Sequence, residues 1–373
     1  MRKKYFVFIF ILLTTISYSF SQETNVLSYG NKITIHSEIL NQDREIYIHL
    51  PNDYEDCVSS YPVLYVMDGE QTFYPMSGLV ELMSWERLIP KMIVVGIPNI
   101  DRMNDFMPLI DTISNSGGAD KFISFFNKEL FPYMKEHYRT EPFNILFGHS
   151  RLGMFTVYCL KKYPNTFNAY IAGSPSLRYN YNYLCSENFP VESLDQNRFF
   201  YFSIGDLENK KSIEDVSQLT SIVKKNNSDK LIWNSDIVSN VGHELNLSLA
   251  FINGLNFIFS DWIKIKQVVN QGLGAAENHF SMLSEKYAYT VKVPEDIFRL
   301  GGLYYLQNGN INVSIEIFKK YIQSYSTAYN AYNYLGEALI LNNDIKAAKE
   351  CFEIALQLKP DFKKAKDNLG KIK

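Results

Sequence analysis

The sequence predicts an α/β fold, with a mostly parallel central sheet and helices on both faces, followed by a small all-α extension. Between residues 62 and 206, short apolar runs rich in β-branched and aromatic residues alternate with stretches long enough for helices. This alternation is typical of βαβ units and a parallel sheet. From residue 295 onward the pattern changes, because Gly302, Gly336 and Gly370 are spaced 34 residues apart, which is the period of a helical repeat.

The chain begins with a segment typical of a secretory signal peptide. A basic start at residues 2–4 precedes an apolar run at 5–13, and the small residues Ser19 and Ser21 follow. We therefore expect residues 1–21 to be removed and the mature protein to be exported, either to a periplasm or to the medium. An uncleaved membrane anchor is the alternative, although the run is short for a span of about 20 residues. No later segment has the length and apolarity of a membrane helix, so the mature chain is expected to have no membrane span.

The composition favours an enzyme of small or neutral molecules over a nucleic-acid-binding protein. The 373 residues are 46% hydrophobic and 15% aromatic, which suits one large core with an appendage. A formal net charge of −3 provides no basic field for nucleic acid or an anionic membrane. The four cysteines show no Cys-x-x-Cys spacing, which argues against a zinc site or a redox pair. We expect free thiols, although export would permit disulfides.

The main domain is expected at residues 24–266. It opens with a β-hairpin, whose two strands lie within 32–39 and 44–51. Further strands are expected at 62–68, 92–98, 143–150, 169–175 and 199–206. Aromatic and apolar residues recur on one face of the segment 119–138, which predicts an amphipathic helix that crosses over the sheet.

The tail is expected to be helical throughout. Residues 267–294 should form a connector, and 295–373 should form repeats that resemble the tetratricopeptide unit, at 295–328 and 329–362 with a partial helix after them. Small residues let the two helices of a unit approach closely, and a phenylalanine fills the gap to the next unit. Such repeats present a surface for peptides, so a protein partner is one possible role. Packing against the main domain is the other.

The segment FNILFGHSRLG at 143–153 predicts a nucleophilic serine. An apolar strand runs into Gly148, Ser150 follows, and the next residues are compatible with a helix, which is the context of a nucleophile elbow. The usual pattern G-x-S-x-G requires glycine at position 152, but the chain has Leu152, with Gly153 one place later. We expect the larger side chain to crowd the elbow.

A serine nucleophile needs a histidine base and an acid that orients it, in the chain order Ser, acid, His for this context. Only His243 and His279 follow Ser150. His243 is the expected base because it lies where a glycine-containing loop enters an amphipathic helix, whereas His279 lies in the connector. The last predicted strand ends next to Asp206 and Glu208. Glu208 is favoured as the acid because it has room to turn back, and Asp206 is the alternative, since aspartate commonly bonds the backbone of its own turn.

Two backbone N–H groups should stabilise the oxyanion of the transition state. One is expected from Arg151, the residue after the nucleophile. The other is expected from the loop after the strand at 62–68, at Gly69 or Glu70.

With these residues in place, the chain resembles the esterase D-like family of α/β-hydrolases, which includes ferric-siderophore, feruloyl and acetylxylan esterases and S-formylglutathione hydrolases. The resemblance covers residues 32 to about 262. It is carried by the opening hairpin, by YPVLYVMDGE at 61–70, by VVGIPNIDRMNDFMP at 94–108, by the segment 148–177, and by the late GDLE and GH motifs. It implies the α/β-hydrolase fold and hydrolysis of a small-molecule carboxylic ester through an acyl-serine, without a metal or organic cofactor.

The resemblance also implies roles for single residues. Ser150 matches the nucleophile, His243 the base and an acid of the GDLE turn its partner. Arg102 falls where siderophore-type members have an arginine near the substrate, although a surface ion pair with Asp101 or Asp105 is an equally plausible role.

One departure from the family pattern keeps a second class of function open, because Leu152 replaces a glycine. Arg151 is also not the usual residue beside the nucleophile. The alternative is a hydrolase-fold scaffold or binding protein with weakened catalysis, which uses its helical tail to dock a protein partner.

Overall fold

A computed structural model of the chain describes residues 29–109, 116–186, 189, 194–226, 228–262 and 272–372. The expected signal peptide at 1–21 and the first part of the connector, 267–271, lie outside the described residues. No helix within the described ranges is long and apolar enough to cross a membrane.

Within these residues the main domain is built on one eight-stranded sheet in the order β1-β2-β4-β3-β5-β6-β7-β8. The strands are β1 (Asn31–Ser37), β2 (Gln42–His49), β3 (Tyr61–Met67), β4 (Ile93–Ile97), β5 (Thr140–His149), β6 (Ala169–Gly173), β7 (Arg198–Gly205) and β8 (Leu231–Val238). β1 pairs antiparallel with β2, and β2 with β4, while every later pairing is parallel. The predicted α/β class, with its opening hairpin, is confirmed.

Strand β8 was not predicted. It pairs in parallel with β7 at the edge of the sheet, and its residues are mostly only partly buried. Asn234, Ser235 and Asp236 interrupt the apolar run, because an edge strand needs fewer core-facing side chains than a central one. The strand therefore lacks the continuous apolar pattern of its neighbours.

Helices cover both faces of the sheet. They are α1 (Gly69–Trp85), α2 (Arg102–Phe106), α3 (Ala119–Phe125), the π-helical turn η1 (Phe126–Leu130), α4 (Phe131–His137), α5 (Arg151–Lys162), the 3₁₀ turn η2 (Leu177–Asn180), α6 (Tyr181–Leu184), α7 (Lys210–Lys225) and α8 (His243–Ile258). Alternate residues of β3 face opposite sides, because successive side chains of a strand point to opposite faces. Tyr65 packs in one core cluster with Phe122 of α3, whereas Leu64 packs in another with Phe251 of α8. The helix expected at 119–138 is present as α3, η1 and α4 in succession.

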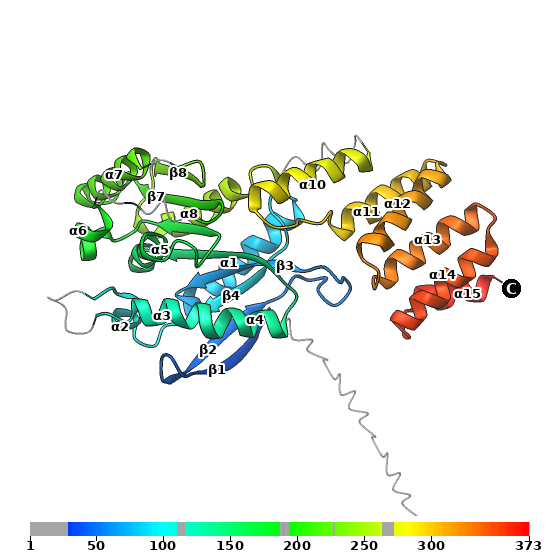
Figure 1. Cartoon of the computed structure of the whole chain (residues 1–373), viewed down its shortest axis with the longest axis horizontal. Helices are drawn as coiled ribbons and strands as arrows, with labels where there is room; N and C mark the ends of the chain where they lie inside the picture. Colours follow the sequence, from blue (N-terminus) through cyan, green and yellow to red (C-terminus); the bar gives the residue numbers. More distant parts are fainter. Residues whose placement is uncertain are drawn as a thin grey trace, which may run out of the picture.

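The tail continues as helices α10 (Leu273–Tyr287), α11 (Glu295–Gln307), α12 (Ile311–Ser324), α13 (Tyr329–Leu341), α14 (Ile345–Leu358) and α15 (Lys363–Lys371). Figure 1 shows α11 to α15 at one end of the molecule, beside α10. A Cβ atom on Gly302 would lie 2.3 Å from the Phe318 ring, and one on Gly336 would lie 2.6 Å from the Phe352 ring. The repeated glycines therefore allow the close contact of each helix pair, as their spacing predicts.

Candidate active site

The residues predicted for catalysis lie at one edge of the sheet, where the parallel strands have their carboxyl ends. Ser150 follows β5, and Glu208 lies three residues after the end of β7. His243 is the first residue of α8, beyond β8, and Gly69 is the first residue of α1, beyond β3. Because β3, β5, β6, β7 and β8 are parallel neighbours, their ends bring together residues that are far apart in sequence.

Ser150 occupies a strained turn between β5 and α5. Its backbone has φ 60° and ψ −117°, a conformation that a residue with a side chain rarely adopts. The turn requires small neighbours, since a Cβ on Gly148 would lie 2.2 Å from the carbonyl oxygen of Leu152. A Cβ on Gly153 would lie 2.8 Å from the carbonyl oxygen of Gly173. This is the geometry of a nucleophile elbow.

Leu152 does not stand exposed at the elbow. Its side chain is fully buried in the hydrophobic core, in the same cluster as Phe155. The tight approach to β6 occurs at Gly153 instead. The departure from the usual pattern therefore moves the required glycine by one residue and directs the larger side chain into the core.

His243 and Glu208 form a close pair. The Nδ1 atom of His243 lies 2.8 Å from Oε2 of Glu208. The other carboxylate oxygen accepts hydrogen bonds from the Ser174 hydroxyl at 2.6 Å and from the Gly205 N–H at 3.1 Å. Burial raises the pKa of Glu208, but the hydrogen bonds from His243, Ser174 and Gly205 outweigh it and hold the pKa below its ordinary value.

The same pair raises the pKa of His243. The hydrogen bond to Glu208 is the largest cause, and burial acts in the opposite direction. When the imidazole is neutral, a proton on Nδ1 that is donated to Glu208 leaves Nε2 free to accept another proton. This is the tautomer that a general base requires.

Asp206, the alternative acid, has other contacts. Its carboxylate accepts hydrogen bonds from the Ser239 hydroxyl at 3.1 Å and from the Val241 N–H at 3.3 Å. It thus bonds the backbone and side chain of the loop that precedes His243. Of the two carboxylates, Glu208 is the one that contacts the imidazole. His279 lies in α10, away from this edge.

His243 lies beside the elbow because it contacts His149, the residue before the nucleophile. The ring centroids of His149 and His243 are 4.6 Å apart, and Nε2 of His149 lies 2.9 Å from the carbonyl oxygen of His243. Burial, followed by repulsion from His243, lowers the pKa of His149 to about 4, so His149 is neutral near neutral pH. The Ser150 hydroxyl lies 3.3 Å from that of Ser176. Catalytic hydrogen bonds often tighten only when a substrate is bound.

The predicted oxyanion donors lie at two helix N-termini. Gly69 and Glu70 begin α1 and Arg151 begins α5, and the first N–H groups of a helix have no partner within it. A Cβ on Gly69 would lie 2.7 Å from the backbone nitrogen of Ile97, so only glycine fits there. These two helices follow the neighbouring strands β3 and β5. Their positive ends therefore lie at the same edge of the sheet.

Arg102 lies at this edge and pairs with Asp68. Its Nη2 atom is 2.7 Å from Oδ2 of Asp68, the residue before Gly69. The ion pairs considered as its alternative role are wrong, because Asp101 accepts the N–H of Asn104 at the start of α2 and Asp105 pairs with the buried Arg44 at 2.8 Å. The side chain of Arg102 is 37% exposed, so it is partly accessible from solvent.

Two residues of the site were missed from the sequence. The Asn246 amide, which is fully buried on α8, donates to the Ser174 hydroxyl at 2.8 Å and to the Ser203 carbonyl at 3.1 Å. Ser174 in turn donates to Glu208, and its backbone has φ 43°. A signal existed in the sequence, since Ser174 lies near the carboxyl end of the predicted strand at 169–175 and Asn246 lies three residues after His243, on the same face of a helix.

The mostly parallel sheet, the strained serine turn and the later carboxylate–histidine pair define an α/β-hydrolase. The chain belongs to the putative esterase family, whose model matches residues 37–233. This membership places it among the carboxylic ester hydrolases.

Individual relatives agree with this assignment. The chain is similar to the ferri-bacillibactin esterase BesA of Bacillus subtilis, with 30% identity over 144 residues, which cover 33% of this chain and 50% of the relative. The match thus spans about half the length of that curated relative. Among solved structures, an IroE-like serine hydrolase from Shewanella oneidensis has a TM-score of 0.70 at 23% identity, with 79% of this chain and 99% of that chain covered. A protein from Capnocytophaga ochracea covers 92% of this chain and 99% of its own, with a TM-score of 0.59 at 16% identity. Both structures share the fold.

Proposed function

We propose that this protein hydrolyses carboxylic esters through an acyl-serine intermediate, with Ser150 as nucleophile, His243 as general base and Glu208 as the acid that orients the base. The observation that carries the proposal is the Glu208–His243 contact of 2.8 Å beside a serine at φ 60°. The His243 ring lies 4.6 Å from that of His149, the residue before this serine, and backbone strain of this kind is concentrated at functional sites.

The reaction follows from these positions. Nε2 of His243 takes the proton of the Ser150 hydroxyl as its oxygen attacks the ester carbonyl. The N–H of Arg151 and that of Gly69 or Glu70 stabilise the negative oxygen that forms. His243 then gives the proton to the departing alcohol. A water molecule, activated by the same histidine, attacks the acyl-serine and releases the acid.

The substrate is proposed to be a small-molecule ester, and an ester of a ferric siderophore is the first candidate. The relative from Bacillus subtilis is named a ferri-bacillibactin esterase, which favours this class. The partly exposed side chain of Arg102, which pairs with Asp68 next to Gly69, adds a cation that an anionic substrate could contact. A panel of siderophore, feruloyl, sugar acetate and short-chain aryl esters would rank these classes by kcat/KM.

The protein is further proposed to act outside the cytoplasm after removal of residues 1–21. The basic start and apolar run of this segment support export. Mass spectrometry of the protein from its producing cell tests this. An intact N-terminus in the membrane fraction would instead favour an anchor.

The catalytic proposal has a direct test. The purified protein should release acid from p-nitrophenyl acetate and react with a fluorophosphonate probe at Ser150, and Ser150→Ala should abolish both. Ser217→Ala is a matched control, because Ser217 is exposed on α7 and bonds only its own helix. Absence of both hydrolysis and labelling in the folded wild-type protein would contradict the proposal.

The scaffold alternative has less support. That alternative depends on Leu152 disturbing the elbow, but the Leu152 side chain is fully buried in the core. The pairing of Glu208 with His243 is also retained.

A further inference from the structure

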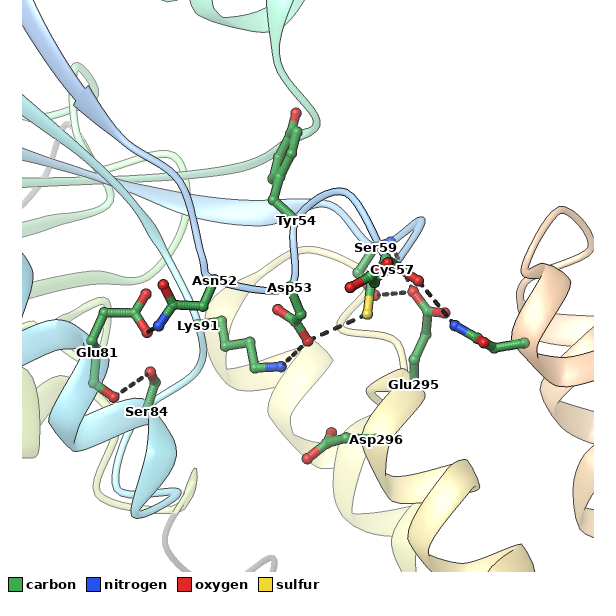
Figure 2. Close-up of polar contacts among 12 residues, drawn as sticks. Asn52, Asp53, Tyr54, Cys57, Ser59, Glu81, Ser84, Lys91, Glu295 and Asp296 are labelled. Carbon is green, nitrogen blue, oxygen red and sulfur yellow. Dashed lines mark hydrogen bonds and ion pairs between the residues drawn. The ribbon is translucent and has the colours of Figure 1, made fainter. Parts of the chain in front are cut away.

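The loop that joins β2 to β3, residues 50–60, contacts the helical tail through a buried carboxylate. Oε1 of Glu295, the first residue of α11, accepts hydrogen bonds from the N–H groups of Val58 at 2.8 Å and Ser59 at 2.9 Å and from the Ser59 hydroxyl at 2.8 Å. Its Oε2 accepts the Tyr321 hydroxyl at 2.8 Å. Figure 2 shows Glu295 pointing toward Ser59 from the tail. Glu295 is only 4% exposed, so these four hydrogen bonds replace nearly all the contacts that its carboxylate would make with water.

A second group of tail residues binds the same loop at Asp56. Its carboxylate accepts hydrogen bonds from the Tyr329 hydroxyl at 3.1 Å and from the Lys359 ammonium at 3.2 Å. The Asn330 amide donates to the carbonyl oxygen of Asp56 at 3.2 Å. We call Glu295, Tyr321, Tyr329, Asn330 and Lys359 the tail face.

The main domain holds the other side of this loop. The guanidinium of Arg139 lies 3.6 Å from the centre of the Tyr54 ring, and its Nε donates to the Ser59 carbonyl at 3.1 Å. Lys91 forms an ion pair with Asp53, which Figure 2 also shows. The loop is therefore bound from two sides and would have little freedom to leave the tail face.

Loss of the loop would leave Glu295 in an unfavourable state. Three of its four hydrogen-bond donors belong to Val58 and Ser59. Removing the donors from a buried carboxylate costs far more free energy than replacing the donors and the carboxylate together by apolar groups. The tail face is thus suited to an occupant that offers two successive N–H groups and a hydroxyl beside an acidic residue, and the loop offers this set.

The contact lies far from the catalytic edge. Tyr61 begins β3 directly after the loop and pairs with Thr140 at the start of β5, whereas Ser150 follows the end of β5. A cavity of about 140 Å³ at this junction is lined by residues of the loop, of α1 and of the tail, such as Cys57, Ser84 and Ile297, and not by Ser150 or His243. Helix α10 also buries Phe280 in the core of the main domain.

We propose that the tail is an intramolecular binding module whose ligand is the loop 50–60 of its own hydrolase domain. It stabilises that loop at the edge opposite the active site, without taking part in hydrolysis. An outside peptide could occupy the tail face only after displacing the loop. The proposal is independent of the catalytic assignment.

Hydrogen–deuterium exchange on the full mature chain tests it directly. The amides of Val58 and Ser59 should be protected in the wild type, because their bonds end on a charged tail residue, and should exchange about tenfold faster or more in Glu295→Ala. Amides of β5 should not change. Glu316→Ala is the matched control, since Glu316 is an exposed carboxylate of the tail that pairs with Lys319 on its own helix.

The outcomes separate the alternatives. Unprotected Val58 and Ser59 amides in the wild type, or unchanged rates in Glu295→Ala, would overturn the proposal. If Glu295→Ala fails to fold, two milder variants replace it. Glu295→Gln keeps the side-chain shape, and Lys359→Ala removes a contact with the exposed Asp56 carboxylate. In both variants the loop amides should exchange faster than in the Glu316→Ala control. Hydrolysis of p-nitrophenyl acetate should stay within about twofold of wild type in each folded variant, and a parallel loss of activity and loop protection would refute the separation from the active site.

Discussion

Replacing Glu208 by glutamine tests the site most sharply, because the surrounding hydrogen bonds dictate how the amide must sit. In the native protein, Ser174 and the Gly205 N–H both donate to Oε1, while His243 contacts Oε2. The Gly205 N–H can only donate, so the glutamine oxygen must stay at the Oε1 position. Its NH₂ group then faces Nδ1 of His243. The histidine is forced to accept there and to carry its proton on Nε2, where it can no longer take the proton of Ser150.

The expected loss follows from this change of tautomer. A comparable change in a serine protease triad lowers kcat by about 10⁴-fold, so we expect Glu208→Gln to lower kcat by about 10³- to 10⁴-fold. This corresponds to about 4–5.5 kcal/mol of activation free energy. KM should change little, because Glu208 is oriented toward His243 and not toward the substrate.

The assay is steady-state hydrolysis of p-nitrophenyl acetate, with thermal unfolding as a check on folding. Asp206→Asn is the matched control, since Asp206 bonds Ser239 and Val241 and not the imidazole. It should keep kcat within about tenfold of wild type. A folded Glu208→Gln variant with kcat within tenfold of wild type, or a larger loss in Asp206→Asn, would refute the assignment of the acid.

Three further predictions concern the same edge of the sheet. The pKa of His243 is raised by Glu208 and the base must be neutral, so kcat/KM should rise with pH through a midpoint above 6.5, and a midpoint below that value would contradict the pair. Ser174→Ala removes one donor to Glu208 and should lower kcat about tenfold and stability by about 1–3 kcal/mol, as followed by kinetics and urea unfolding; unchanged values would show that this hydroxyl is dispensable. Gly148→Ala would bring a Cβ to 2.2 Å from the Leu152 oxygen. It should lower the free energy of unfolding by about 2–3 kcal/mol and should reduce labelling of Ser150 by the fluorophosphonate probe. An active, equally stable variant would show that the turn tolerates a side chain.

The sequence predicted the fold well where apolar patterns were continuous. The central strands β3, β6 and β7 are buried along their whole length, and β5 is buried over most of its second half. Buried parallel strands produce apolar runs that are easy to recognise. Strand β8 was missed because it lies at the edge of the sheet and three consecutive polar residues, Asn234, Ser235 and Asp236, interrupt its apolar run. The tail helices followed from the glycine spacing, since Gly302 and Gly336 each accommodate a phenylalanine ring.

The site was predictable to the extent that chain order reflects strand order. Ser150, Glu208 and His243 follow the parallel strands β5, β7 and β8, so their order in the sequence indicated a shared edge. The predicted ion pair of Arg102 with a neighbouring acid was wrong, because its actual partner, Asp68, is 34 residues away in sequence. Asn246 was missed because it acts on Glu208 only through Ser174, although its position three residues after His243 was a signal.

The tail contact also affects the order in which the chain can fold. Val58 and Glu295 are 237 residues apart in sequence. The contact of the loop 50–60 with Glu295 can therefore form only after the start of the tail has been synthesised. Closing so long a loop is slow, and contacts of high sequence separation form late. A ribosome-bound or truncated chain would therefore present Val58 and Ser59 without their hydrogen bonds to Glu295. The completion of the tail would then cover this side of the loop 50–60.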